Sequence, residues 1–169
     1  EGRDLSPRAF LQDVLQLDLD AYATCVTFME RPGYDFGEPC LLEVRDNWRR
    51  KDSYLNLPLD DFMRVIEGAV AGGYSLVIGG DNSEPGVDGR YDAAVIPSWD
   101  IPHDYIDQAG REHRIVNGET GDDHGIHIVG HTRVGDRQWY LIKDSNRSSR
   151  LGTFAGYYFF DADYVKLKM

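Results

Sequence analysis

Residues 122–131 read DDHGIHIVGH and residues 139–145 read WYLIKDS, and these two stretches decide the fold. Isoleucine, valine, tryptophan and tyrosine favour extended structure over helix. We therefore predict strands over residues 124–131 and 138–143. The Gly-Asp pair that begins at Gly135 favours a tight turn, so the two strands are expected to form a β-hairpin.

Two further apolar runs predict strands on either side of this hairpin. Residues 157–160, Tyr-Tyr-Phe-Phe, form the third predicted strand of the last third of the chain. Residues 75–80, Ser-Leu-Val-Ile-Gly-Gly, read as a short buried strand bounded by glycine. A second short apolar piece follows at residues 93–96, and polar residues then continue to Asp123.

Two helices are expected in the first half of the chain. The clearer one begins after Pro58 and ends at Gly72-Gly73, because its apolar residues recur at helical spacing. These residues are Leu59, Phe62, Met63, Ile66 and Val70. The other helix begins at Ser6, whose hydroxyl can cap the free amides that follow Pro7. Its expected buried stripe consists of Phe10, Leu11, Val14 and Leu15.

The order of the elements sets the fold class. Helices come first and strands last, and residues 17–57 between them read as loops and short extended pieces, so an α+β fold is expected. The chain has 169 residues, of which 41% are hydrophobic. That is enough for one folded domain with a sizeable core.

The charge of the chain excludes two classes of partner. Eighteen basic residues against 29 acidic ones give a net charge of −11, which repels both nucleic acid and an anionic membrane surface. Because no apolar run approaches the roughly 18 residues of a membrane span, the chain is expected to be soluble. Its compartment, cytoplasmic or bacterial periplasmic or secreted, stays open. The first residue is Glu1 rather than Met, which indicates that an upstream segment was removed.

Cys25 and Cys40 are the two cysteines, and they lack the CxxC spacing of a zinc or redox site. One disulfide is conceivable, but the pattern favours two structural thiols.

Three histidines, His124, His127 and His131, lie within eight residues. On a helix they would share one face and, together with Asp122 or Asp123, could hold a metal ion. On a strand His124 and His127 point to opposite faces and cannot chelate together. The intervening isoleucine, valine and glycine favour the strand, so no metal or other cofactor is expected.

Asp144 stands at the end of the second hairpin strand, where it can pair with His124. A carboxylate there can accept the Nδ1 proton, fix the tautomer of the ring and leave Nε2 free for acid–base chemistry. The two residues share a face only if the loop holds an odd number of residues or a strand is bulged. The alternative is that Asp144 merely ends a strand.

Six segments carry a resemblance to one family. They are DHGI at 123–126, WYLIKDS at 139–145, GTFAGY at 152–157, LEVRDNWR at 42–49, NLPLD at 56–60 and GGD at 79–81. Together they resemble the second half of a papain-like cysteine peptidase, and more closely its bleomycin hydrolase/aminopeptidase C branch. The likeness covers nearly the whole chain.

The resemblance implies a papain-like fold in which this chain is the β-rich, histidine-bearing lobe with flanking helices. His124 matches the catalytic histidine, and Asp144 matches the residue that orients its ring. In the family the nucleophile is a cysteine thiolate on the other lobe, stabilised by the imidazolium. The implied activity is hydrolysis of a peptide substrate. The cysteine-bearing lobe is expected upstream, so residues 1–169 would be the C-terminal part of the peptidase domain.

Four features depart from the family pattern. Neither cysteine stands in a Gln-x-Gly-x-Cys-Trp motif, and Asp144 replaces asparagine. Asn146 and Arg147 replace a tryptophan and a glycine, and the sequence stops at Met169 without the C-terminal arm of this branch. A catalytically inactive module for peptide binding or assembly is therefore the alternative to a peptidase. In both cases we expect a partner, either the cysteine-bearing lobe, a second chain or a homo-oligomer.

Overall fold

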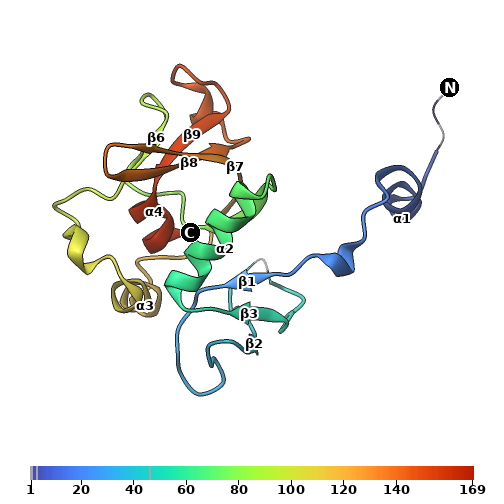
Figure 1. The fold of residues 1–169 in the computed structure, drawn as a ribbon, viewed down its shortest axis with the longest axis horizontal. Coiled ribbons are helices and arrows are strands. Elements are labelled where there is room, and N and C mark those ends of the chain that lie inside the picture. Colours follow the sequence, from blue (N-terminus) through green and yellow to red (C-terminus); the bar gives the residue numbers. More distant parts are fainter. Residues whose placement is uncertain (1, 3, 46) are drawn as a thin grey trace.

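The computed structural model describes residues 2, 4–45 and 47–169. Glu1 and Asp46, which entered the sequence analysis, lie outside the described residues. The chain forms a body of two sheets and several helices, from which an N-terminal arm extends (Figure 1). The predicted α+β class is confirmed.

Six strands form the main sheet, in the order β4-β7-β8-β9-β6-β5. Their bounds are β4 Leu76–Gly80, β5 Val87–Asp88, β6 Ala93–Ala94, β7 His124–Val134, β8 Arg137–Lys143 and β9 Tyr157–Asp161. Neighbouring strands run antiparallel, except that β6 lies parallel to β9. The three strands predicted for the last third are confirmed as β7, β8 and β9. Gly135 and Asp136 form the turn of the predicted hairpin.

The described residues form four α-helices and several shorter helical segments. The α-helices are α1 Pro7–Ala9, α2 Leu59–Ala71, α3 Gln108–Asn117 and α4 Ala162–Lys168. A π-helical segment spans Phe10–Leu15, and 3-10 turns span Leu19–Ala21, His103–Tyr105 and Arg147–Arg150. The prediction for α2 is confirmed. Past its end, Gly73 has a φ of 84°, a conformation that glycine adopts without steric cost.

One face of the main sheet carries the hydrophobic core. Its buried side chains are Ile126 and Ile128 of β7, Tyr140 and Ile142 of β8, and Tyr158 and Phe160 of β9. Phe62 and Ile66 of α2 and Tyr164 of α4 pack into the same cluster. Each large apolar side chain buried in this way stabilises the fold by roughly 1.5–3 kcal/mol.

Two features of the body differ from the sequence expectations. The strand β4 is half-buried rather than buried, because it lies at the edge of the sheet and turns Val77 to solvent, 85% exposed. The helix α3 lies in the stretch that read as merely polar. Its buried side chain is Arg111, which donates to the carbonyls of Thr27 and Lys166, so no apolar stripe marks this helix in the sequence.

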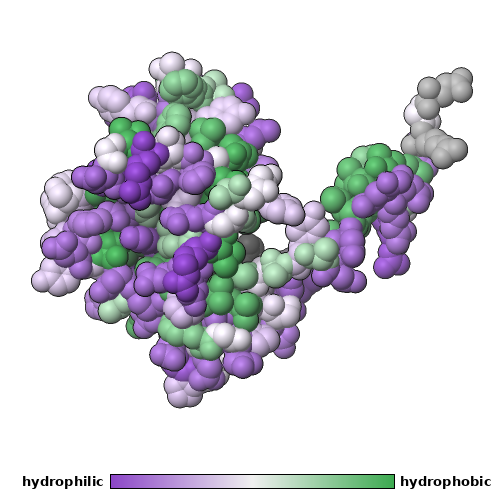
Figure 2. Space-filling view, in the orientation of Figure 1, coloured by the Kyte–Doolittle hydropathy of each residue, from purple (hydrophilic) through white to green (hydrophobic). Residues whose placement is uncertain are grey.

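The N-terminal arm is the largest departure from the sequence analysis. Ser6 caps α1 as predicted, since its Oγ accepts from the amide of Ala9. The expected buried stripe, however, is wrong: Phe10, Val14 and Leu15 are about half exposed. The arm stands away from the body, and its apolar side chains gather on one side (Figure 2). The residues of this stripe do form a helical segment, but nothing in the described chain covers it.

A three-stranded sheet, in the order β1-β3-β2, occupies the region that was expected to contain short extended pieces. Its strands are β1 Cys25–Val26, β2 Pro39–Cys40 and β3 Tyr54–Asn56. The fully buried Asn56 holds the surrounding loops, donating to the carbonyls of Met29 and Tyr34 and accepting from the amide of Phe28. None of the helices in the described part of the chain is both long and apolar enough to cross a membrane.

Candidate active site

His124 and Asp144 are in contact at one end of the buried sheet face. Nε2 of His124 lies 2.7 Å from Oδ1 of Asp144. The imidazole side chain is 25% exposed, whereas the carboxylate side chain is 0% exposed. The ring is therefore accessible from solvent while its partner is not, and the predicted contact between the two residues is confirmed.

A bulge in the hairpin brings the two side chains to the same face. The turn holds two residues, which alone would place the pair on opposite faces. The register shifts by one residue between Ile128 and Gly130, so that His127 pairs with Lys143. Extended by one residue, this register sets Asp144 opposite Ile126. His124, two residues before Ile126, then shares the face of Asp144.

The ring meets the carboxylate through Nε2, so the expectation that Nδ1 would do so is wrong. His124 is diagonal to Asp144 across the two strands, and the ring nitrogen farther from the backbone spans that distance. A carboxylate oxygen accepts, so Nε2 donates. Nδ1 is consequently the ring nitrogen turned away from Asp144, and it is the atom that can take up or release a proton.

The carboxylate of Asp144 is fixed by its own backbone and by the loop that follows. Oδ1 also accepts from the amide of Asn146 at 3.0 Å. The main-chain amide of Asp144 donates to the carbonyl of Gly156, and its carbonyl accepts from Oγ of Ser149. Oδ2 is buried without a hydrogen-bond partner among the described residues. Because Oδ1 is bound by the amide of Asn146 and the main chain of Asp144 is bound by Gly156 and Ser149, the carboxylate can hold the ring in one orientation while Nδ1 gains or loses a proton.

A second carboxylate, that of Asp123, lies next to His124 in the sequence. Its Oδ1 accepts from the amide of Asn82 at 2.8 Å, and its own amide donates to the carbonyl of Gly80, the residue paired with His124. Burial raises the pKa of Asp123, but hydrogen bonds from Ser83 and Asn82 outweigh that effect, and the net pKa is lowered. A fixed negative charge therefore adjoins His124.

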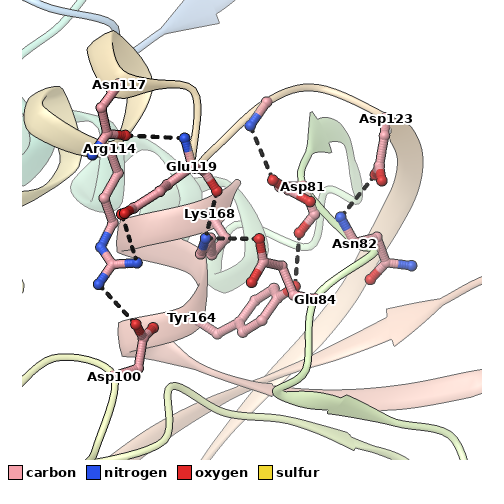
Figure 3. Close-up of polar contacts among 11 residues, drawn as sticks. Asp81, Asn82, Glu84, Asp100, Arg114, Asn117, Glu119, Asp123, Tyr164 and Lys168 are labelled. Atoms are coloured by element: carbon pink, nitrogen blue, oxygen red, sulfur yellow. Dashed lines mark hydrogen bonds and ion pairs between the residues drawn. The ribbon is translucent and has the colours of Figure 1, made fainter.

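The loop after β4 is fixed in turn by an ionic network at the C-terminal helix, which the sequence analysis missed (Figure 3). Nζ of Lys168 donates to Oε1 of Glu84 and to the carbonyl of Glu119. Arg114 binds Asp100 and the carboxylate of Glu119. The GGD motif at 79–81 marked this loop as a family feature. No sequence signal showed that α4 would pack beneath it.

Neither cysteine provides a nucleophile beside His124. Cys25 and Cys40 belong to the three-stranded sheet, on either side of β3, whereas His124 begins β7 of the main sheet. Both are free thiols, and burial raises the pKa of each. A raised pKa lowers the thiolate fraction near neutral pH, which is the opposite of what a catalytic cysteine needs.

The other histidines of the cluster lie apart from the pair. The strand assignment for residues 124–131 is confirmed, so His127, paired with Lys143, faces away from His124. Nδ1 of His131 contacts Nε2 of Gln138 at 3.3 Å on an exposed part of the hairpin. Within residues 2, 4–45 and 47–169, no group of three or more His, Cys, Asp or Glu side chains is placed to hold a metal ion.

Comparison with known proteins gives a likeness in structure. No protein-family model matches the sequence, and no curated protein matches it either. The crystal structure of PepW from Lactobacillus rhamnosis HN001 matches with a TM-score of 0.71 at 15% sequence identity. The match covers 99% of this chain and 38% of the PepW chain. This chain therefore has an α+β fold similar to the papain-like fold of PepW and spans well under half of that protein's length.

Proposed function

We propose that this chain is the histidine-bearing part of a papain-like cysteine peptidase and supplies the general base for peptide-bond hydrolysis. The observation that carries the proposal is the contact between Nε2 of His124 and the buried carboxylate of Asp144. It fixes the ring and directs Nδ1 away from Asp144. The similarity of the fold to PepW supports the same reading.

In the proposed reaction Nδ1 of His124 removes the proton of a cysteine thiol, and the thiolate attacks the carbonyl carbon of the peptide. The imidazolium then gives its proton to the leaving amine, which leaves an acyl-thioester. A water molecule, deprotonated by Nδ1, hydrolyses the thioester and restores the thiol. Asp144 keeps the ring oriented through both halves of the cycle.

The nucleophile would come from a cysteine-bearing lobe or a partner chain. The raised pKa values of Cys25 and Cys40, and their place in the other sheet, speak against either thiol in that role. PepW has more than half of its chain outside the match, which is room for a second lobe. The finer assignment to the bleomycin hydrolase/aminopeptidase C type rests on the sequence motifs alone.

A catalytically inactive module for peptide binding or assembly is the second candidate. The specific observation in its favour is the segment after Asp144. Asn146 caps the 3-10 turn Arg147–Arg150 with its side chain, so no indole screens the pair from water there. Oδ2 of Asp144 is buried without a hydrogen-bond partner among the described residues. An asparagine at this position would have an amide nitrogen, which is a hydrogen-bond donor, in place of Oδ2.

The test is hydrolysis of aminoacyl and peptidyl fluorogenic reporters by this chain in complex with a papain-like cysteine-bearing lobe, with the 169-residue chain alone assayed alongside. We expect turnover by the complex, complete loss after alkylation with iodoacetamide, and no turnover by the 169-residue chain alone. Turnover that survives alkylation would rule out a thiol peptidase. No turnover with any reporter would favour the inactive module.

A further inference from the structure

Residues 144–156 connect β8 to β9 and include Asp144. A residue in the turn between β5 and β6 forms hydrogen bonds with this segment. That residue is Asp92, which lies between β5 and β6 and is 3% exposed. Its Oδ2 accepts from the amide of Thr153 at 2.7 Å and from the amide of Phe154 at 3.0 Å. Its carbonyl accepts from the amide of Phe159 at 2.7 Å, in β9.

The backbone at Asp92 is shaped for this contact. Asp92 has a φ of 52°, in the left-handed region that non-glycine residues adopt rarely, although aspartate tolerates it better than most. On the opposite side, a Cβ at Gly152 would lie 2.1 Å from Oδ1 of Asp92, so only glycine allows the carboxylate to approach this closely. Strained backbone is retained where surrounding contacts determine it.

Short hydrogen bonds connect the end of the segment that Asp92 binds to Asp144 at its beginning. The amide of Gly156 donates to the carbonyl of Ser149 at 2.6 Å, and the amide of Asp144 donates to the carbonyl of Gly156 at 2.9 Å. Oγ of Ser149, fully buried, lies 3.1 Å from the carbonyl oxygen of Asp144 and 2.7 Å from that of Asn146, so its one proton can be shared between the two. The segment is thus a closed unit whose two ends meet at Asp144.

We propose that Asp92 is a positioning residue that holds segment 144–156 so that the carboxylate of Asp144 stays against Nε2 of His124. Hydrogen bonds from amides to an ionised, buried acceptor are stronger than neutral ones, and two consecutive amides share this acceptor. Without it, a segment of this length between two strands would open locally. The role in catalysis rests on the proposed function, whereas the positioning itself does not.

The test reads the His124 Nε2 proton by NMR in the 169-residue chain. A ring proton bonded to a buried carboxylate exchanges slowly with water and resonates downfield. We expect Asp92→Gly to exchange it at least about tenfold faster, because glycine keeps the positive φ but removes the acceptor. Asp92→Asn should restore slow exchange, because a single amide oxygen can accept from both Thr153 and Phe154. Since both variants lose the charge, the difference between them isolates the hydrogen bonds.

Two further variants complete the experiment. Asp88→Asn is the matched control, because Asp88 lies in the same turn but is paired with Arg90, and it should leave the signal unchanged. Gly152→Ala should displace the carboxylate from the other side and speed exchange as Asp92→Gly does, so it serves where Asp92→Gly does not fold. Wild-type exchange in folded Asp92→Gly or Gly152→Ala would overturn the proposal. Because the readout is not activity, a result that favours the inactive module over the proposed peptidase would leave this inference standing.

Discussion

Nζ of Lys168 lies 2.8 Å from Oε1 of Glu84, and this ion pair joins the last turn of α4 to the loop that follows β4. The lysine side chain is 2% exposed and the glutamate side chain is 19% exposed. Tyr164, one turn earlier in α4, donates from its hydroxyl to the carbonyl of Asp81. The C-terminal helix therefore fixes the loop whose amide at Asn82 binds Asp123, next to His124.

Lys168→Met should lower the free energy of unfolding by about 3 kcal/mol at pH 7, because it leaves Glu84 charged and without its partner. Urea denaturation followed by tryptophan fluorescence measures this value. Lys166→Met is the control, since Lys166 is 32% exposed and lies 4.0 Å from Asp163. That change should cost under about 1 kcal/mol.

The effect of Lys168→Met should depend on pH. Burial raises the pKa of Glu84, and the bond to Lys168 opposes that rise, so removing the lysine raises the pKa further. An acid with a raised folded-state pKa loses stability as the pH climbs through the range between its unfolded and folded values. The deficit of the variant should therefore narrow as the pH falls from 7 to about 4, where Glu84 is becoming protonated in both states. A deficit that is constant between pH 7 and pH 4 would contradict the role of Glu84.

Deleting residues 1–22 should leave the free energy of unfolding of the body within about 0.5 kcal/mol of the intact chain. The apolar residues of the arm are exposed, so the body loses no core contact with them. Denaturant melts of the two chains compare the values. A loss above about 1 kcal/mol would mean that the arm packs on the body in solution.

Cys25 and Cys40 should react with iodoacetamide more slowly than a free cysteine at pH 7.5. Burial raises the pKa of both thiols, which lowers the thiolate fraction at that pH. Of the two, Cys40 should be the slower, because it is buried whereas Cys25 is partly exposed. Mass spectrometry after timed alkylation gives both rates. A thiol that reacts faster than free cysteine would identify an activated nucleophile within this chain.

The elements that the sequence predicted well are those with a strong local pattern. The helix α2 combines an apolar stripe with proline before it and glycine after it, and the strands β7, β8 and β9 are rich in residues that favour extended structure. The sequence predicted the contact between His124 and Asp144 only on the condition that the hairpin loop has an odd number of residues or that one strand is bulged. Gly130 stands next to the bulge that meets this condition, but an isolated glycine in a strand only suggests a bulge and does not fix the register.

The elements that the sequence did not predict depend on contacts distant in the chain. The helix α3 buries an arginine that binds two carbonyls from other segments, so its pattern looks polar. The helix α4 is short, and its buried Lys168 is explained only by Glu84 and Glu119, which lie far away in the sequence. In the N-terminal arm the sequence predicted buried residues that are in fact exposed. An apolar stripe on a helix predicts that some surface covers it, but it does not say where that surface is.

The proposed role of His124 as the general base of a thiol peptidase is tested by kcat for reporter hydrolysis by this chain in complex with a cysteine-bearing lobe, with single substitutions in β7. We predict that His124→Ala lowers kcat by about 100-fold or more, the usual contribution of a general base. His127→Ala, on the opposite face of the same strand, should keep kcat within about twofold of wild type, since surface changes of this kind are near neutral. A His124→Ala protein with kcat within about twofold of the His127→Ala control, both folded, would contradict the account.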